Sequence, residues 1–288
     1  MSETATPKSG TAPALHAKTE TRIARRFREL AAARETGLVA YITAGDPSLD
    51  ASLAIVLAAD EAGADVIELG VPFSDPVADG PTIQRASERA LLAGATMGSV
   101  IELVRRIRKQ SEVPLVLFSY FNPILQYGLD KFAKEAAAAG ADGVLATDLT
   151  LEEAGDYYAL MHAHGLDTIF LAAPTSTDER LKKISALSTG FLYMISRTGV
   201  TGARDKMPDE LPALTKRARR FTKLPIAVGF GISQPDHIAA LAGVADAAVV
   251  GSALMSEIEN AATPDGAAAA IGAKIRTLKQ ATRKLPRG

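Results

Sequence analysis

The sequence predicts an α/β protein that forms a single (β/α)8 barrel, the TIM-barrel fold. Short apolar runs alternate along the chain with segments of helical period, and eight such runs occur. Strict alternation of strand and helix calls for a parallel sheet, and eight strand–helix units close a barrel. A doubly wound open sheet is the alternative, but no G-x-G-x-x-G follows the first run, where a dinucleotide-binding fold would carry it.

The composition is that of an ordinary globular protein and excludes several functions. The 288 residues include 32 Lys and Arg against 33 Asp and Glu, so the net charge of −1 gives no support for binding nucleic acid or an anionic membrane. Zero Cys excludes disulfides, thiolate metal sites and a cysteine nucleophile, and makes the cytoplasm the expected location. No apolar run approaches the ~18 residues of a membrane span, and no signal peptide is expected.

A repeated motif marks several strands. AGADVIELG at 62–70, AGADGVLAT at 139–147 and GVADAAVVG at 243–251 each follow a segment of helical period. The glycine at the start of each motif is therefore expected to end a helix in the left-handed conformation; these are Gly63, Gly140 and Gly243. The apolar runs that follow are typical of strands buried on both faces. The eight strands are expected near residues 39–43, 66–70, 115–120, 144–146, 168–171, 191–196, 226–229 and 247–250.

Helices are expected beyond the minimal barrel repeat. An amphipathic segment at 21–36 precedes the first strand, and the second βα connection at 81–110 is long enough for extra helices. The last helix is expected at 267–284. Residues 1–20 contain almost nothing to bury, so we expect a disordered tail there and one barrel domain over 21–288.

The second strand points an ionisable side chain into the barrel. In VIELG, the side chains of Val66, Glu68 and Gly70 share one face of the strand, and those of Ile67 and Leu69 share the other. An unpaired carboxylate inside a barrel costs several kcal/mol, or avoids that cost by taking up a proton. A catalytic role for Glu68 is therefore favoured over a buried glutamate that is merely satisfied by hydrogen bonds.

A loop rich in Pro and Gly, GVPFSDPVADGPTIQ at 70–84, follows this strand directly. It places Asp75 and Asp79 at the carboxyl end of a barrel strand, where the catalytic residues of such barrels lie. For either Asp taken alone, the structural alternatives are an Asx-turn or a helix N-cap ahead of Pro81, since Pro suits the first helical turn.

Glycine-bearing turns follow the late strands and predict a phosphate site. They lie at 196–204, 229–233 and 251–253, and Ser233 and Ser252 are expected at helix starts. Free amides at helix starts bind anions, and barrels of this kind hold phosphate after their seventh and eighth strands. Simple turns and helix caps are the alternative for any one of the three.

The remaining charged residues do not indicate a site. The four histidines have no metal-ligand spacing, so no metal site is predicted. Arg85, Arg89 and the RRIRK run at 105–109 are expected to be solvated helix faces.

From ELGVPFSDPVADGPTIQ (68–84) onward the pattern is specific, and the sequence resembles the tryptophan synthase alpha chain family. The resemblance covers residues 22–280, with Thr150 standing where a Pro is common in the family. Further matching segments appear in family order: YITAGDP (41–47), SYFNPI (119–124), APTST (173–177), YMISRTGVTGAR (193–204), GFGIS (229–233) and VVGSA (249–253).

This resemblance implies a retro-aldol cleavage of indole-3-glycerol phosphate into indole and D-glyceraldehyde 3-phosphate, a step of L-tryptophan biosynthesis. It makes Glu68 the acid/base at the reacting carbon and Asp79 the carboxylate that engages the indole N–H. By position, the ring pocket would consist of Tyr41, Phe118, Tyr120 and Tyr193. The phosphate would be held by Thr201, Gly202, Gly229, Phe230, Gly231, Gly251 and Ser252.

The resemblance also implies a partner, the pyridoxal-phosphate beta chain, in an α2β2 assembly. No cofactor or metal is expected in this chain. The expected contact elements are the loop at 72–81, the SYFNPI segment and the loop at 197–206. Three alternatives stay open: another phosphate-binding barrel lyase or isomerase, an autonomous indole-3-glycerol-phosphate lyase, and a catalytically silent subunit that activates a partner enzyme.

Overall fold

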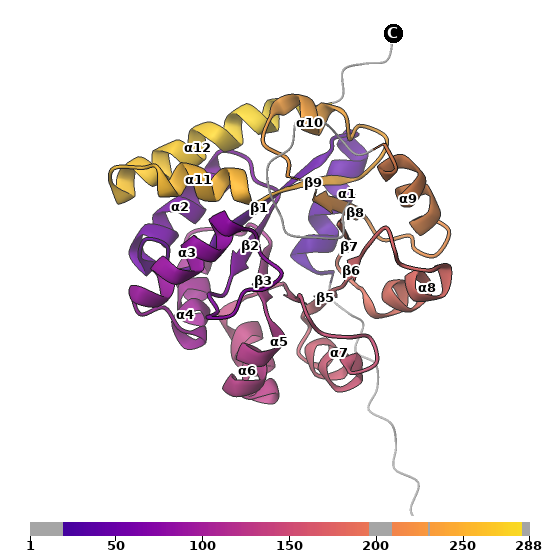
Figure 1. Cartoon of the computed structure of the whole chain (residues 1–288), viewed down its shortest axis with the longest axis horizontal. Helices are drawn as coiled ribbons and strands as arrows, with labels where there is room; N and C mark the ends of the chain where they lie inside the picture. Colours follow the sequence, from indigo (N-terminus) through magenta and orange to yellow (C-terminus); the bar gives the residue numbers. More distant parts are fainter. Residues whose placement is uncertain (1–19, 196–208, 230, 284–288) are drawn as a thin grey trace, which may run out of the picture.

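A parallel sheet that curves into a barrel organises this chain, with helices around the outside of the strands (Figure 1). The computed structural model describes residues 20–195, 209–229 and 231–283, so the expected tail lies almost wholly outside the described residues. The strands pair in the order β5-β4-β3-β2-β1-β9-β8-β7-β6. Their bounds are β1 Gly37–Thr43, β2 Val66–Gly70, β3 Leu115–Ser119, β4 Gly143–Ala146, β5 Asp167–Ile169, β6 Leu171–Ala172, β7 Leu192–Ile195, β8 Ile226–Gly229 and β9 Ala247–Val250.

The parallel barrel predicted from the sequence is confirmed, but one of its eight strands is divided. The run at 168–171 forms two short strands, β5 and β6, of which β5 pairs with β4 and β6 pairs with β7. Between them, Phe170 is buried against the ring of Tyr157, with ring centroids 6.2 Å apart. The chain therefore pairs with β4 before Phe170 and with β7 after it. The backbone through Phe170 closes the ring of strands, because no strand pairing among the described residues joins β5 to β6.

Helices follow the strands around the barrel, and the extra helices are confirmed. One precedes β1, and two lie in the connection from β2 to β3. The last helix starts and ends earlier than the expected 267–284, because Thr263 caps it and Pro264 occupies its first turn. The bounds are α1 Arg22–Ala33, α2 Leu49–Glu61, α3 Pro81–Leu92, α4 Met97–Arg108, α5 Phe121–Tyr127, α6 Leu129–Ala139, α7 Ala154–Ala163, α8 Asp178–Leu187, α9 Leu211–Ala218, α10 Pro235–Ala239, α11 Ser252–Glu259 and α12 Pro264–Gln280.

The barrel interior is a separate apolar cluster. Alternate residues of the strands fill it, among them Val39, Val66 and Val116, while Ile67 and Leu69 pack outward against the helices. The alternation expected for VIELG is thus confirmed. Side chains of α1 join the same interior cluster through Ile23, Phe27 and Leu30, so this helix closes one end of the barrel.

The repeated motif does more than end helices. The three motif glycines do take positive φ angles, of 100° at Gly63, 97° at Gly140 and 78° at Gly243. Gly63 and Gly140 lie at helix ends as expected, but the expectation is wrong for Gly243, because α10 ends at Ala239 and a turn separates it from Gly243. In addition, the Asp that follows each motif glycine, two residues later in the first two motifs and three in the last, accepts a hydrogen bond from a backbone N–H near the start of a neighbouring strand. The pairs are Asp65 with Leu38 at 2.6 Å, Asp142 with Leu115 at 2.8 Å, and Asp246 with Ile226 at 2.7 Å.

Two of these carboxylates, those of Asp65 and Asp142, are buried and also bind arginines. Asp142 pairs with Arg22 of α1 at 3.1 Å and with Arg108 of α4 at 2.5 Å, and Asp65 pairs with Arg26 at 2.6 Å. The expectation that the 105–109 run is solvated is therefore wrong for Arg108, whose side chain is only 9% exposed. The ion pairs hold α1 at the amino ends of the strands, so the carboxyl ends remain open for a site.

Replacing Asp142 by Asn should lower the free energy of unfolding by about 3 kcal/mol, because the buried Arg108 guanidinium loses its carboxylate partner. Urea denaturation at pH 7 measures this loss. Glu112→Gln is the matched control, since Glu112 also binds Arg22, at 2.6 Å, but is 69% exposed. It should cost less than ~1 kcal/mol, and equal losses in the two variants would show that burial of the Asp142 pair is not what stabilises this end.

Candidate active site

Glu68 lies on β2 with its side chain inside the barrel. It is fully buried and pairs in register with Tyr41 of β1 and Val116 of β3. Among the described residues, neither oxygen of its carboxyl group has a hydrogen-bond partner. Burial raises the pKa of Glu68 to about 8, so at neutral pH this carboxyl group is mostly protonated. It can therefore donate a proton, and the resulting carboxylate is a strong base in its apolar surroundings.

Asp79 lies in the loop between β2 and α3, and the structure excludes its alternative role as a helix cap. The N-cap of α3 is Gly80, and the Asp79 carboxylate instead accepts a hydrogen bond from the Tyr120 hydroxyl at 3.0 Å. Burial raises the pKa of Asp79 to about 6, although the bond from Tyr120 acts in the opposite direction. Asp79 is therefore mostly ionised at neutral pH, unlike Glu68.

The other loop aspartate does not join this pair. The Asp75 carboxylate is exposed and accepts a hydrogen bond from the Ser74 hydroxyl at 2.5 Å. The backbone at Asp79 is tied to α3, since the Gln84 amide donates to the carbonyl oxygen of Asp79 at 2.9 Å.

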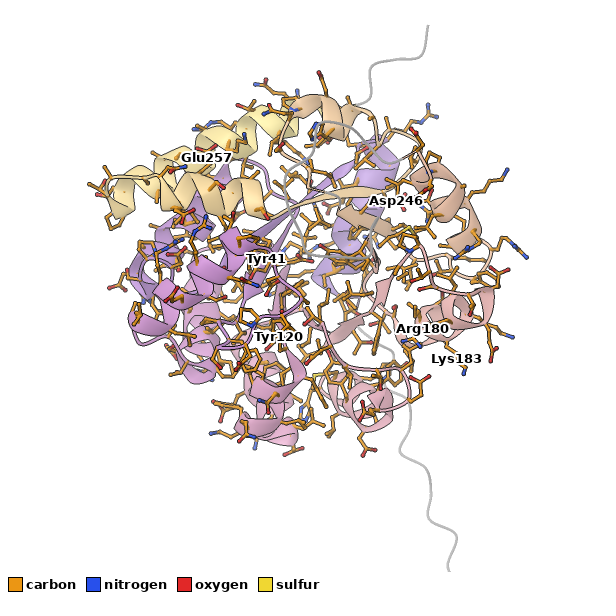
Figure 2. All side chains as sticks on the ribbon, viewed as in Figure 1. Tyr41, Tyr120, Arg180, Lys183, Asp246 and Glu257 are labelled. Carbon is orange, nitrogen blue, oxygen red and sulfur yellow. The ribbon has the colours of Figure 1, made fainter. Side chains whose placement is uncertain are left out.

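The predicted ring residues gather around the two acids. The rings of Tyr41 and Phe118 meet edge to face with centroids 5.1 Å apart. Figure 2 shows Tyr41 and Tyr120 near the centre of the view, where the strands converge. Burial, followed by the nearby charges of Glu68 and Asp79, raises the pKa of Tyr193 well above its ordinary value. Both acids and three tyrosines therefore face one space at the carboxyl ends of the strands.

The glycine turns predicted to hold phosphate border the same space. A Cβ atom at Gly251 would lie 3.6 Å from that of Tyr41, and one at Gly229 would lie 3.0 Å from the Tyr193 hydroxyl. Gly251 is the N-cap of α11, so the N-cap residue has no side chain that could accept from the first amides of this helix, at and after Ser252. Of the other predicted phosphate residues, Gly231 has a φ angle of 83°, and Thr201, Gly202 and Phe230 lie outside the described residues.

One expected helix start is wrong. Ser233 does not begin a helix, because α10 starts at Pro235 with Gln234 as its N-cap. The backbone N–H of Ser233 instead donates to Nδ1 of His237 at 3.3 Å.

An ion-pair network that sequence reasoning missed fastens α3 to α11. Arg89 donates to both oxygens of the buried Asp46, at 2.9 and 2.8 Å, and to Glu259 at 3.0 Å. Arg85 binds both oxygens of Glu259, at 2.7 and 2.8 Å. These two arginines were expected to be solvated. The network matters to the site because α3 begins just after Asp79 and α11 begins at Ser252.

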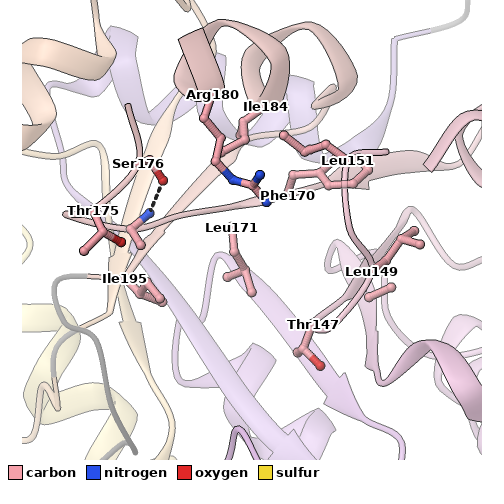
Figure 3. A pocket seen from close by; sticks show the side chains of 12 residues that line it. Thr147, Leu149, Leu151, Phe170, Leu171, Thr175, Ser176, Arg180, Ile184 and Ile195 are labelled. Atoms are coloured by element: carbon pink, nitrogen blue, oxygen red, sulfur yellow. Dashed lines mark hydrogen bonds between the residues drawn. The ribbon is translucent and has the colours of Figure 1, made fainter. Parts of the chain in front are cut away.

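A cavity of about 290 Å³ lies beside the site, at the carboxyl ends of β4, β6 and β7 (Figure 3). Its walls combine apolar side chains with the hydroxyl groups of Thr147, Thr175 and Ser176, and Arg180 of α8 reaches toward it. None of the predicted site residues that the structure describes lines it. This cavity could not be predicted from local sequence patterns, because its walls come from four separated segments: Ala146, Thr147, Leu149, Leu151, Phe170, Leu171, Ala173, Thr175, Ser176, Arg180, Ile184 and Ile195.

Residues 20–195, 209–229 and 231–283 contain neither a candidate metal site nor a candidate membrane span. No group of three or more His, Cys, Asp and Glu side chains there could hold a metal ion. No helix in those ranges is long and apolar enough to cross a membrane.

Comparison with known proteins identifies the family. Residues 27–283 match the family model of the tryptophan synthase alpha chain. The tryptophan synthase alpha chain of Solibacter usitatus is 53% identical over 268 residues, which cover 93% of this chain and 98% of that protein. The alpha chain of Geobacter sulfurreducens is 48% identical over 263 residues, covering 91% and 98% respectively.

Solved structures agree in fold over nearly the whole chain. A tryptophan synthase structure from Mycobacterium tuberculosis superposes with a TM-score of 0.86 at 37% identity, covering 92% of this chain and 100% of that one. The tryptophan synthase alpha subunit of Legionella pneumophila superposes with a TM-score of 0.82 at 39% identity, covering 92% and 99%. On these grounds, this chain belongs to the tryptophan synthase alpha chain family.

Proposed function

We propose that Glu68 and Asp79 carry out the reaction of this family, the retro-aldol cleavage of indole-3-glycerol phosphate. Breaking the bond between indole C3 and the glycerol chain needs a proton at C3 and removal of the proton from the adjacent hydroxyl. Glu68 supplies the first proton and, as a carboxylate, accepts the second, so it is regenerated in each turnover. The bonding electrons return to the ring, and the products are indole and D-glyceraldehyde 3-phosphate.

Asp79 has a different role in this proposal. Protonation at C3 places positive charge on the ring nitrogen, and an ionised carboxylate that accepts a hydrogen bond from the N–H stabilises that charge. The observation that carries the proposal is the fully buried carboxyl group of Glu68, which has no hydrogen-bond partner among the described residues, beside the less buried Asp79. Their environments separate the pKa values of the two acids, which is how a pair of carboxyl groups divides acid and base roles.

The remaining site residues would bind the substrate without reacting. We propose that Tyr41, Phe118, Tyr120 and Tyr193 surround the flat indole ring. The phosphate would lie at the glycine turns, where backbone amides and the positive end of the α11 dipole favour an anion. The proposed phosphate residues are Thr201, Gly202, Gly229, Phe230, Gly231, Gly251 and Ser252.

We propose a partner as well, the beta chain of tryptophan synthase in an α2β2 assembly, which would carry pyridoxal phosphate while this chain carries no cofactor. Support comes from exposed apolar side chains near the site: Val77 is 79% exposed in the Asp79 loop, and Leu125 of α5 is 49% exposed. Both lie in or beside the segments predicted to touch the partner, at 72–81 and 119–124. A chain without Cys suits the cytoplasm, where we place the reaction.

Replacing Glu68 by Gln should lower kcat by about 100- to 10,000-fold, the usual contribution of a general acid–base. Asp79→Asn should lower it by about 10- to 100-fold, because a charged hydrogen-bond acceptor is lost. Both variants should fold and bind glycerol phosphate. The exposed Glu112→Gln is the control and should retain the wild-type rate of indole release. If Glu68→Gln loses thermal stability yet still turns over, Glu68 is structural.

The reaction should show a bell-shaped dependence of kcat/KM on pH. Asp79 must be ionised, so the rate should fall as the pH drops through its pKa of about 6. Glu68 must be protonated, so the rate should fall again as the pH rises through its pKa of about 8. Steady-state rates on indole-3-glycerol phosphate measure both limbs. A rate that continues to rise above the upper pKa would contradict the assignment of Glu68 as the acid.

A beta chain should accelerate indole release, and Val77→Asp should abolish that acceleration while leaving the rate of the chain alone unchanged. A charge at this exposed apolar position would be desolvated on docking. The conservative Val77→Leu is the matched control and should respond like the wild type. Equal rates with and without a beta chain would refute the partnership. A normal response of Val77→Asp would instead exclude this loop from the contact.

A further inference from the structure

Tyr120 joins the end of β3 to the Asp79 loop through its hydroxyl group. This hydroxyl accepts the backbone N–H of Ala78 at 2.9 Å and donates to the Asp79 carboxylate at 3.0 Å. A phenol can do both at once, since it has one donor and two acceptor lone pairs. The side chain of Tyr120 is only 4% exposed, so water does not readily replace either bond.

The ring of Tyr120 contacts the same loop a second time. The Phe73 ring, near the start of the loop, packs against it with centroids 5.2 Å apart. Because Tyr120 itself is the N-cap residue of α5, its backbone is fixed between β3 and that helix. One rigid side chain therefore holds both the beginning and the end of a loop that has no regular secondary structure.

We infer that Tyr120 is a positioning residue, whose hydroxyl, oriented by the Ala78 amide, holds the Asp79 carboxylate where it can accept the ring N–H of the substrate. This inference rests on the proposed roles of Asp79 and Glu68. It goes beyond the wall of the ring pocket that the family resemblance assigns to Tyr120. Without the hydroxyl, the Ala78 amide loses its acceptor and the carboxylate loses a donor, so the end of the loop is freed to move.

The hydrogen bond also affects when Asp79 ionises. Among the described residues, the titratable groups that share this space with Asp79 are Glu68 on β2, Tyr41 on β1, Tyr120 on β3 and Tyr193 on β7. The three tyrosines are uncharged at neutral pH, and Glu68 is mostly protonated there. Burial raises the pKa of Asp79, and the Tyr120 hydroxyl opposes this effect by stabilising the carboxylate. Removing the hydroxyl should therefore raise the pKa of Asp79 further.

Tyr120→Phe tests the inference, because it deletes the hydroxyl and keeps the ring. The variant should lower kcat by about tenfold to a hundredfold, as expected for a lost hydrogen bond to a charged group, with little change in KM. The acidic limb of the kcat/KM profile should move to higher pH. Tyr157→Phe is the matched control: Tyr157 is also buried and donates to the carbonyl oxygen of Val144 at 3.1 Å, away from the site. It should leave both kcat and the profile unchanged.

A double variant separates a positioning role from a structural one. If Tyr120 acts through Asp79, adding Tyr120→Phe to Asp79→Asn should not lower kcat further than Asp79→Asn alone. Additive losses, or an unmoved acidic limb, would overturn the inference. Wild-type turnover by Asp79→Asn would instead defeat the proposed function itself.

A titration that needs no enzymatic turnover tests the inference even if Tyr120→Phe is inactive for another reason. The pKa of Asp79 can be read from the carboxyl ¹³C signal of aspartate-labelled protein, with Asp79→Asn to assign the signal. The value in Tyr120→Phe should exceed that in the wild type. An equal or lower value would overturn the inference, whatever the activity.

Discussion

Removal of the Glu68 carboxyl group from water is the constraint on which the rest of this structure depends. The strand alternation directs it inward, and the apolar cluster inside the barrel offers it no compensating bond among the described residues. Helix α1 seals the amino ends of the strands, and the ion pairs of Asp65 and Asp142 hold that helix in place. A loosened α1 would admit water beneath Glu68 and return its pKa toward that of an ordinary glutamate.

At the carboxyl ends of the strands, by contrast with the apolar interior around Glu68, hydrogen bonds and ion pairs hold the structure in place. Tyr120 binds Asp79, and the Arg89 pairs with Asp46 and Glu259 fasten α3 to α11. The loop that carries one acid and the helix whose start would face the phosphate are thereby fixed relative to each other. A rigid frame of this kind places a charge where it develops in the transition state without reorganisation during the reaction.

Much of the fold and the position of Glu68 could be predicted, because strand periodicity and left-handed glycines are local properties of the sequence. Gly63 and Gly140 lie at helix ends as expected, and the Glu68 side chain is buried inside the barrel, as the alternation in VIELG predicts. Ion pairs between distant residues could not be predicted. Nothing near Arg108 in the sequence indicates that it binds the buried Asp142. The bond from Tyr120 to Asp79 spans 41 positions and was hidden for the same reason.

Direct titration of the Glu68 carboxyl group tests the central claim. Glutamate labelled with ¹³C at the side-chain carboxyl, with Glu68→Gln to assign the signal, gives the pKa of this one group in the folded chain. The account predicts a value of about 8, set by burial. A value near 4.5, the ordinary one for glutamate, would mean that water or a partner reaches the carboxyl group, and Glu68 would then be ionised at neutral pH and unable to act as the acid.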